Sequence, residues 1–364
     1  MSISEAALLE ALKTVVDPYT GRDFVSTKQL RELTAGADGG VTFAVSMGYP
    51  CRSQWPLLEQ ALAAAARRVP GVAQVQVQFH TEVVSHAVQR GVQLLPGVKN
   101  IVAVASGKGG VGKSTTAVNL ALALQAEGAR VGVLDADIYG PSQPTMLGVN
   151  GRPESQDGQT MDPLVGHGVQ VMSIGFLVEA DQAMIWRGPM ATQALDQLLR
   201  QTRWHDLDYL VVDMPPGTGD IQLSLSQRVP LTGAVIVTTP QDIALIDAKR
   251  GLRMFEKVGV PILGLVENMA VHVCSNCGHA EHVFGAGGGE RMALEYGVEH
   301  LGALPLALKI REQADSGRPT VVAEPDSEEA GLYKAVARRV AAKLALQAKD
   351  YSAKFPTITI SKGT

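Results

Sequence analysis

The chain has 364 residues, of which 46% are hydrophobic and 19% are charged, and its formal net charge is −4. These are the values of a globular protein long enough for two domains, and they give no reason to expect a DNA-binding or membrane-binding surface. The start, MSISEAALLEAL, lacks the basic and apolar regions of a signal peptide, and no apolar run approaches the roughly 20 residues of a membrane span. Three cysteines are too few for a disulfide framework, which favours a reducing, cytoplasmic setting.

The first segment, roughly residues 1–85, has the pattern of a small α+β domain. Apolar residues recur first at helical spacing and then alternate as in half-buried strands. The predicted elements are a helix over 8–16 that ends at Asp17-Pro18, a strand over 41–47, a helix that Ser53 caps and Pro70-Gly71 ends, and a strand over 75–79. Cys51 follows Pro50 directly, and we interpret it as a buried structural thiol in preference to a metal ligand.

A different pattern begins after residues 86–98, which show no firm period and are predicted to be a linker. Short continuous apolar runs now alternate with helical stretches over residues 99–348, and such strands are typical of a parallel sheet covered by helices. The runs are IVAVAS, RVGVLDAD, VQVMSIGF, YLVVDMPP, GAVIVTTP, ILGLVENM and HLGALP. We therefore predict an α/β domain with a mostly parallel sheet, closed by a helix over 328–347 and followed by a flexible tail, 349–364.

The strand IVAVAS leads directly into GKGGVGKST, and a helical stretch follows. This is the G-x-x-x-x-G-K-[S/T] pattern of a phosphate-binding loop, in which backbone N–H groups and a helix N-terminus surround phosphate oxygens. The predicted nucleotide-binding residues are Gly107, Lys108, Gly109, Gly110, Val111, Gly112, Lys113, Ser114 and Thr115. Lys113 is expected to reach the β- and γ-phosphates of ATP in catalysis, and Ser114 to bind Mg²⁺.

Three carboxylates follow predicted strands, where a parallel sheet presents residues to its ligand crevice. Asp213 ends the strand YLVV and is predicted to hold Mg²⁺ through water. Asp137 is a plausible catalytic residue that orients the attacking water, and Asp135 serves either Mg²⁺ or the structure of its loop. Ordinary strand-end capping is the alternative for Asp213 and Asp135. The glycine-rich segment 215–220 is interpreted as a switch loop.

Lys108 is a second lysine inside the phosphate loop. Since Lys113 already serves the phosphates within its own subunit, Lys108 can act catalytically in a neighbouring subunit, as an arginine finger does. The alternative is a solvated surface lysine, and spacing alone does not decide between the two.

The pair Cys274 and Cys277 supplies two thiolates, whereas tetrahedral zinc or an iron–sulfur cluster needs four ligands. Two copies of the chain would supply four and bridge a cluster across a two-fold axis. Alternatively, His279 and His282 would complete a zinc site within one chain, or the cysteines would form a redox dithiol. The residues alone favour the cluster and zinc equally. The glycine run 285–290 is predicted to open a helix and not a second phosphate site.

These motifs together carry a family resemblance. The loop GKGGVGKST resembles the deviant phosphate loop of the MinD/ParA group of ATPases, and DADIYGPS, DMPPGTGD, VENMA and the C-x-x-C pair resemble its Mrp/ApbC (Nbp35-like) iron–sulfur cluster carriers. The segment 1–85 is similar to the domain that many bacterial members carry before the ATPase. The resemblance implies that Lys108 acts in trans in a nucleotide-bound dimer, that Asn268 recognises adenine, and that Cys274 and Cys277 bind the cluster.

The resulting hypothesis is a cytoplasmic homodimer that uses ATP and Mg²⁺ and passes a labile 4Fe–4S cluster from a donor to apoproteins, without nucleic-acid or membrane partners. A ParA- or MinD-like positioning ATPase shares the phosphate loop, but the acidic net charge, the non-amphipathic tail and the cysteine pair argue against it. A zinc-stabilised regulatory ATPase is the second alternative.

Overall fold

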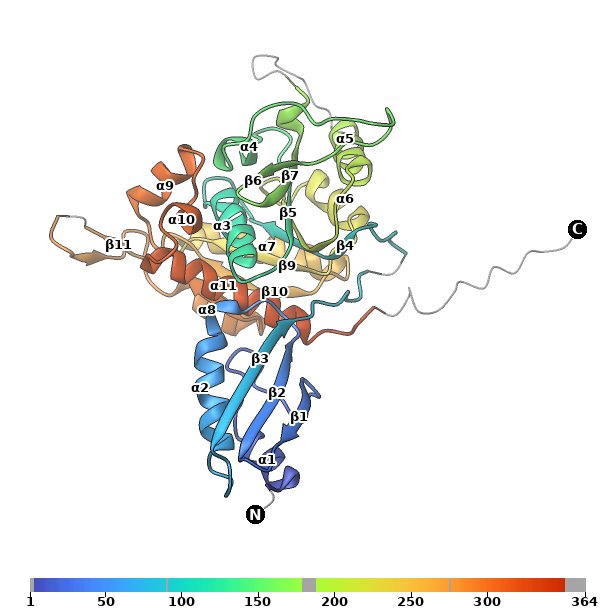
Figure 1. Cartoon of the computed structure of the whole chain (residues 1–364). Coiled ribbons are helices and arrows are strands. Elements are labelled where there is room, and N and C mark those ends of the chain that lie inside the picture. The colour runs from blue at the N-terminus through green and yellow to red at the C-terminus, as the bar shows by residue number, and fades with distance from the viewer. Residues whose placement is uncertain (1–2, 90, 179–187, 275, 351–364) are drawn as a thin grey trace, which may run out of the picture.

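The larger part of the molecule is built on one sheet, seen in the upper half of Figure 1. The computed structural model describes residues 3–89, 91–178, 188–274 and 276–350. The strands of the sheet are β4 (Val98–Ala105), β5 (Val131–Asp135), β6 (Leu164–Gly166), β7 (Val169–Ser173), β8 (Leu207–Asp213), β9 (Gly233–Thr238), β10 (Ile262–Glu267) and β13 (His300–Ala303). Their order is β13-β10-β9-β4-β8-β5-β7-β6, and within this sheet β6 alone runs antiparallel to its neighbour. The predicted mostly parallel sheet is confirmed.

Every residue of the central strands β8 and β9 is buried, because helices cover both faces of the sheet. The helices of this part are α3 (Lys113–Ala126), α4 (Gln143–Met146), α5 (Gly188–Gln201), α6 (Asp220–Arg228), α7 (Asp242–Lys257), α8 (Gly288–Tyr296), α9 (Leu308–Asp315), α10 (Thr320–Ala323) and α11 (Glu328–Ala345), with a short 3-10 turn η2 (Ile174–Phe176). Among these helices, α3 packs against α11, and α5 packs against α6. The predicted closing helix and the helix after the glycine run are both confirmed.

The first segment folds into a separate three-stranded sheet with two helices, at the bottom of Figure 1. Its elements are α1 (Glu5–Leu12), β1 (Leu30–Ala35), β2 (Gly40–Met47), η1 (Arg52–Gln54), α2 (Trp55–Ala66) and β3 (Gln74–Thr81). The strand β2 lies in the middle, antiparallel to β1 and parallel to β3. The α+β character is confirmed, whereas β1 was not predicted.

Two predicted details of this small domain are wrong. The first helix ends at Leu12, well before Pro18, because the chain then turns back through a bridge from Val16 to Asp23. Ser53 does not cap the second helix, since α2 begins after Gln54. Instead, the backbone N–H and hydroxyl of Ser53 donate to the Glu127 carboxylate at 2.9 and 2.6 Å.

That contact belongs to a buried charge cluster that joins the two domains. Glu127 follows α3 and is 1% exposed, and Arg338 of α11 donates to it at 2.5 Å. The same guanidinium donates to the Tyr19 hydroxyl at 2.6 Å and to the Ser53 hydroxyl at 3.0 Å. Because each buried charge has partners from both domains, the cluster positions the small domain against α3 and α11.

The connection between the domains is also paired with the end of the chain. Ala87 N–H donates to the Ala348 carbonyl at 2.9 Å, and Asp350 N–H donates to Ser85 at 3.0 Å. Residues 85–87 and 348–350 therefore run side by side, and the rest of the predicted tail, 351–364, lies outside the described residues.

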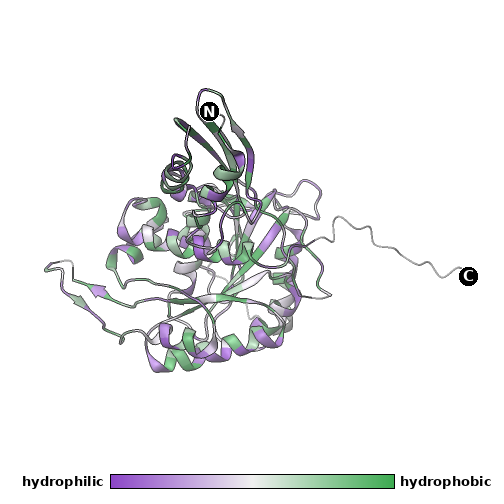
Figure 2. Cartoon of the chain, turned by 90° about the horizontal axis from the view of Figure 1, so that it is seen from below, coloured by the Kyte–Doolittle hydropathy of each residue, from purple (hydrophilic) through white to green (hydrophobic). Residues whose placement is uncertain are grey.

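A small hairpin projects from the larger domain, on the left of Figures 1 and 2. Its strands are β11 (His272–Val273) and β12 (Ala280–Glu281), and the C-x-x-C segment forms its turn. Among the described residues, no helix is both long and apolar enough to cross a lipid bilayer.

Candidate functional site

The register of the large sheet brings the predicted acidic residues to the phosphate loop. Asp213, at the end of β8, lies opposite Asp135 at the end of β5 and opposite Val104 of β4, which leads into the loop. Because β4, β5 and β8 are parallel neighbours, their carboxyl ends meet at one edge of the sheet. Lys113 and Asp213, which are 100 positions apart in the sequence, thus belong to one site.

Two glycines of the phosphate loop are required by close approach to neighbouring elements. Gly112 has φ +79°, and a Cβ atom there would collide with the amide nitrogen of Asn268. A Cβ atom at Gly107 would collide with the backbone of Asp247 in α7. The loop is therefore held between α7 and the residue that follows β10, with α3 starting directly behind it.

Lys113 is the cation at the centre of the site. Its side chain is 6% exposed, and its Nζ lies 2.5 Å from Asp213 Oδ1, 3.7 Å from Asp137 and 3.2 Å from the Ser114 hydroxyl. Asp213 is fully buried. Burial is also the main reason why the pKa of Asp137 is raised. When a phosphate ligand binds, its oxygens can replace the two carboxylates as partners of the buried lysine.

Asp135 has a different environment from Asp213. Its carboxylate accepts backbone N–H groups from Asp137, Ser142 and Gln143 at 2.9–3.2 Å, and the Ser173 hydroxyl at 3.2 Å. Burial and the nearby Asp213 raise its pKa. Four donors occupy this carboxylate, so the geometry favours the loop-structure alternative over a direct magnesium contact.

Gln143 is a residue of the site that sequence reasoning missed. It is fully buried, and its side-chain amide donates to Asp213 Oδ2 at 2.8 Å and to the Ser114 carbonyl at 3.2 Å. It thereby fixes the second oxygen of the carboxylate whose first oxygen faces Lys113. Its place in YGPSQP carries no spacing signal that would have indicated this role.

The donor set at this edge of the sheet fits a magnesium ion. The Ser114 hydroxyl and the Asp213 carboxylate are hard oxygen donors of the kind that Mg²⁺ uses together with substrate phosphates and water. Bound there, the ion would neutralise phosphate charge next to Lys113.

Lys108 lies within the phosphate loop, and Asn268 lies against it. The Lys108 amine is 3.5 Å from Gln241 Oε1, and among the described ion pairs none includes Lys108. The side-chain amide of Asn268 donates to the Val111 carbonyl at 2.9 Å. Asn268 is thus part of the loop's support, and Lys108 is a half-buried cation on the rim of the site.

The two cysteines of the hairpin are close together and accessible. The Cys274 carbonyl accepts from Gly278 N–H, and Cys274 N–H donates to the His279 carbonyl, both at 2.9 Å, which closes a tight turn. Backbone N–H groups of Cys277 and Asn276 lower the pKa of the Cys274 thiol. Cys277 is exposed. A thiol that accepts backbone N–H groups is prepared to bind metal as thiolate.

The histidines of the hairpin do not join this pair. His272 contacts the Leu306 carbonyl through Nδ1 at 2.9 Å, and His282 contacts the Ala270 carbonyl at 2.6 Å. Within the described ranges, no three His, Cys, Asp or Glu side chains gather in a group that could hold a metal ion. Among the described side chains, the two thiols therefore have no third ligand beside them.

Cys51 is far less accessible than the hairpin thiols. It is fully buried, as expected, and this burial raises the pKa of its thiol to about 12. A thiol with that pKa is a poor ligand at neutral pH.

Comparison with known proteins agrees with this geometry. Residues 97–341 match the family model described as NUBPL iron-transfer P-loop NTPase, and residues 5–78 match the one described as iron-sulfur cluster assembly protein. The iron-sulfur cluster carrier protein of Escherichia coli K12 is 51% identical over 350 residues, covering 94% of this chain and 95% of that protein. The mouse iron-sulfur cluster transfer protein NUBPL is 52% identical over 269 residues, covering 73% and 84%.

Solved structures show the same fold. An ADP-bound nucleotide-binding protein from Archaeoglobus fulgidus superimposes with a TM-score of 0.56 at 35% identity, covering 64% of this chain and 90% of that one. The cell division ATPase MinD of Pyrococcus furiosus has a TM-score of 0.52 at 23% identity, covering 66% and 98%, which supports the fold alone. With its phosphate loop, its assembled acids and its cysteine pair, the chain belongs to the iron–sulfur cluster carrier family of P-loop NTPases.

Proposed function

We propose that this protein binds and hydrolyses ATP and carries a labile 4Fe–4S cluster for transfer to apoproteins, with the cluster bridged between two subunits by Cys274 and Cys277. The observation that carries the proposal is the hairpin turn itself. It presents two accessible thiols, one of them with a lowered pKa, and no third ligand gathers there among the described residues.

A symmetric dimer resolves the shortage of ligands. A 4Fe–4S cluster takes four cysteine thiolates, and two copies of the hairpin supply four if a two-fold axis passes between them. The hairpin projects from the larger domain, away from the small domain at the top of Figure 2, which would leave it accessible to a second copy of the chain. A cage divided between two chains opens when the chains separate, which suits a cluster that is cargo.

The nucleotide site supplies the residues for hydrolysis. Lys113 would bind the β- and γ-phosphates in place of its present partner Asp213, while Ser114 and Asp213 would hold Mg²⁺. Asp137, 3.7 Å from Lys113, would orient the attacking water. Asn268 would recognise adenine beside the loop that it supports.

The cluster is tested by anaerobic reconstitution with iron and sulfide. The wild type is expected to bind about four iron and four sulfide per dimer. Cys274→Ala and Cys277→Ala are each expected to lose the cluster, and the matched control Cys51→Ala to retain it. One zinc per monomer, or equal cluster content in all four proteins, would contradict the proposal.

The trans role of Lys108 has a sharper test. Lys108→Gln and Lys113→Gln homodimers are both expected to be nearly inactive. In a mixed dimer, the Lys108→Gln subunit keeps its own Lys113 and receives Lys108 from its neighbour, so mixing equal amounts restores about a quarter of wild-type hydrolysis. No recovery on mixing would place the action of Lys108 within its own subunit.

We also propose a cytoplasmic setting, because an accessible thiol pair needs reducing conditions to stay ready for metal. The partners would be a cluster donor and apoprotein acceptors.

A further inference from the structure

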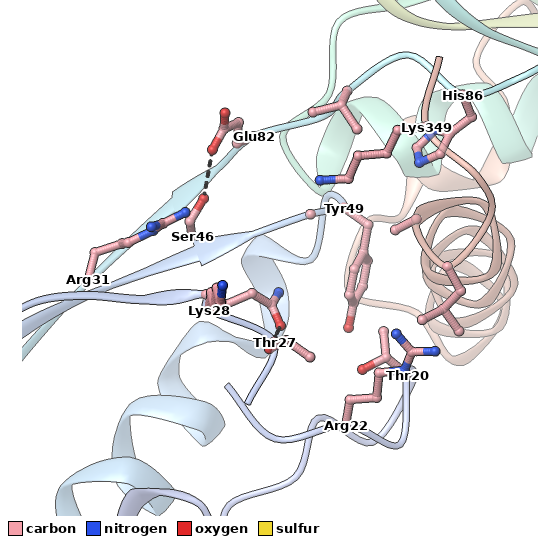
Figure 3. Close-up of a pocket in the computed structure, with 15 residues that line it drawn as sticks. Thr20, Arg22, Thr27, Lys28, Arg31, Ser46, Tyr49, Glu82, His86 and Lys349 are labelled. Carbon is pink, nitrogen blue, oxygen red and sulfur yellow. Dashed lines mark hydrogen bonds between the residues drawn. The ribbon is translucent and has the colours of Figure 1, made fainter. Parts of the chain in front are cut away.

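A cavity of about 310 Å³ lies where three parts of the chain meet, away from both sites described above (Figure 3). The small domain supplies most of its lining, the connection between the domains contributes Val84 and His86, and the segment after α11 contributes Lys349. A volume of this size suits a small molecule and not a protein surface loop.

Four cations surround this cavity, and Figure 3 shows them spread around Ser46 and Tyr49. They are Arg22, Lys28, Arg31 and Lys349. Among the ion pairs formed by described residues, none involves any of the four, whereas Arg130 and Arg338 elsewhere are paired with carboxylates. Four unpaired cations around one hollow are unusual on a chain whose net charge is −4.

The lining holds one acidic side chain, Glu82, which is exposed and accepts from the Ser46 hydroxyl at 3.1 Å. The other polar side chains that line the cavity are neutral donors and acceptors, including Thr20, Thr27 and Gln29. The charge of the lining is therefore strongly positive even with Glu82 ionised.

One residue of the lining, His86, has a buried ring nitrogen without a partner among the described residues. His86 is 2% exposed, and its Nδ1 donates to Asn100 Oδ1 at 2.9 Å, because the Asn100 amide nitrogen donates to the carbonyls of Val84 and Asp208. The other ring nitrogen, Nε2, is buried without a partner among the described residues. Because Nδ1 carries the proton, this Nε2 is an acceptor, so a hydroxyl group of a ligand would complete it and a bare carboxylate or phosphate oxygen would not.

From these observations we infer that the cavity is a binding site for a small anion with two or more negative charges, held through carboxylate or phosphate oxygens. Arg22 and Arg31 present planar forks that match such oxygens, and Lys28 and Lys349 add point charges. The ligand would contact the small domain and the C-terminal segment at once, and so hold them together.

The test is calorimetric titration of the full chain with citrate as a carboxylate probe and with inorganic phosphate as a phosphate probe. Excess ADP is present so that neither probe occupies the phosphate loop. The variants are Arg22→Gln/Arg31→Gln and Lys28→Gln/Lys349→Gln. The control is Arg67→Gln/Arg68→Gln, which removes the same charge from exposed positions after α2, outside the cavity.

Saturable binding of either probe by the wild type is expected, at least about tenfold weaker in each cavity variant and within about twofold in the control. Which probe binds decides between carboxylate and phosphate. The inference is overturned if neither probe binds, or if the control weakens binding as much as the cavity variants do. Because all four substituted cations are exposed, both variants should fold, and circular dichroism checks this.

Discussion

The nucleotide-binding edge of the large sheet and the cysteine hairpin are prepared for their ligands in opposite ways. At the sheet edge, Lys113 and Asp213 are almost fully buried, and both oxygens of Asp213 already have donors. In the hairpin, Cys277 is exposed, and each strand is two residues long. The described residues of the first site already contact one another within one chain, whereas the two thiols of the second have no third ligand beside them among the described residues.

The two regions should therefore differ in how far a mutation that impairs function also lowers stability. A buried charge network contributes to folding as well as to binding, so a change in it should alter both. An exposed turn with few contacts can be changed at little cost to the fold. The predictions below compare these two regions, beginning with the largest expected effect.

Lys113→Gln should lower ATP hydrolysis by at least about a thousandfold, because the cation that stabilises the developing phosphate charge is lost. The variant should still accept a cluster, since the hairpin is unchanged. Hydrolysis and cluster content are measured on one preparation, with Lys257→Gln, an exposed lysine of α7, as the control. Hydrolysis near the wild-type rate would contradict the assigned role.

Glu127→Gln should destabilise the protein by about 3 kcal/mol, because the buried Arg338 guanidinium loses its counter-charge. Urea unfolding measures the effect. Asp315→Asn, which breaks the exposed pair with Arg311, is the control and should change stability little. If both variants lost the same amount of stability, the buried pair at the domain junction would contribute no more than an exposed ion pair.

Asp208, in β8 of the larger domain, gives a pH-dependent test of stability. Burial raises its pKa, but hydrogen bonds from Arg130 and Lys99 outweigh burial and lower the pKa overall. Its ionised form therefore stabilises the fold fully above about pH 4, and this contribution is lost as the pH falls through the lowered pKa.

Asp208→Asn should consequently cost about 1–2 kcal/mol at pH 7. The difference from wild type should stay constant down to pH 5 and narrow below about pH 4. Denaturant unfolding at these pH values measures it. If the stability difference between Asp208→Asn and the wild type grew on acidification, the ionised carboxylate would not be the stabilising form.

The parts of the molecule that were predictable from the sequence depend on local patterns. Seven parallel strands were visible as continuous apolar runs, and the phosphate loop was visible because strand, glycines and helix follow one another directly. Asp135 and Asp213 were found for the same reason, since each ends a strand.

The parts that were missed depend on contacts between distant segments. Ser53 donates to a carboxylate 74 positions away and so does not cap its own helix. The role of Gln143 follows from the contact of its side chain with Asp213 at the end of β8, which no spacing reveals. The strand β1 is mostly exposed at a sheet edge and lacks the apolar alternation that would have indicated it.

The smallest change in stability is expected for a variant of the hairpin, and this change distinguishes the hairpin most clearly from the buried nucleotide site. Cys274→Ala should leave the midpoint of thermal unfolding of the apoprotein within about 1 °C of the wild type, because an exposed turn contributes little to the fold. With cluster bound, the wild type should melt higher and as a dimer, and the variant should not, because only the wild type gains ligand binding on folding. Scanning calorimetry of the apo and reconstituted forms, with the mass of each species, measures both. A large loss of stability in the apoprotein would mean that the turn is a structural element, and the cysteines would then need another explanation than a shared cargo site.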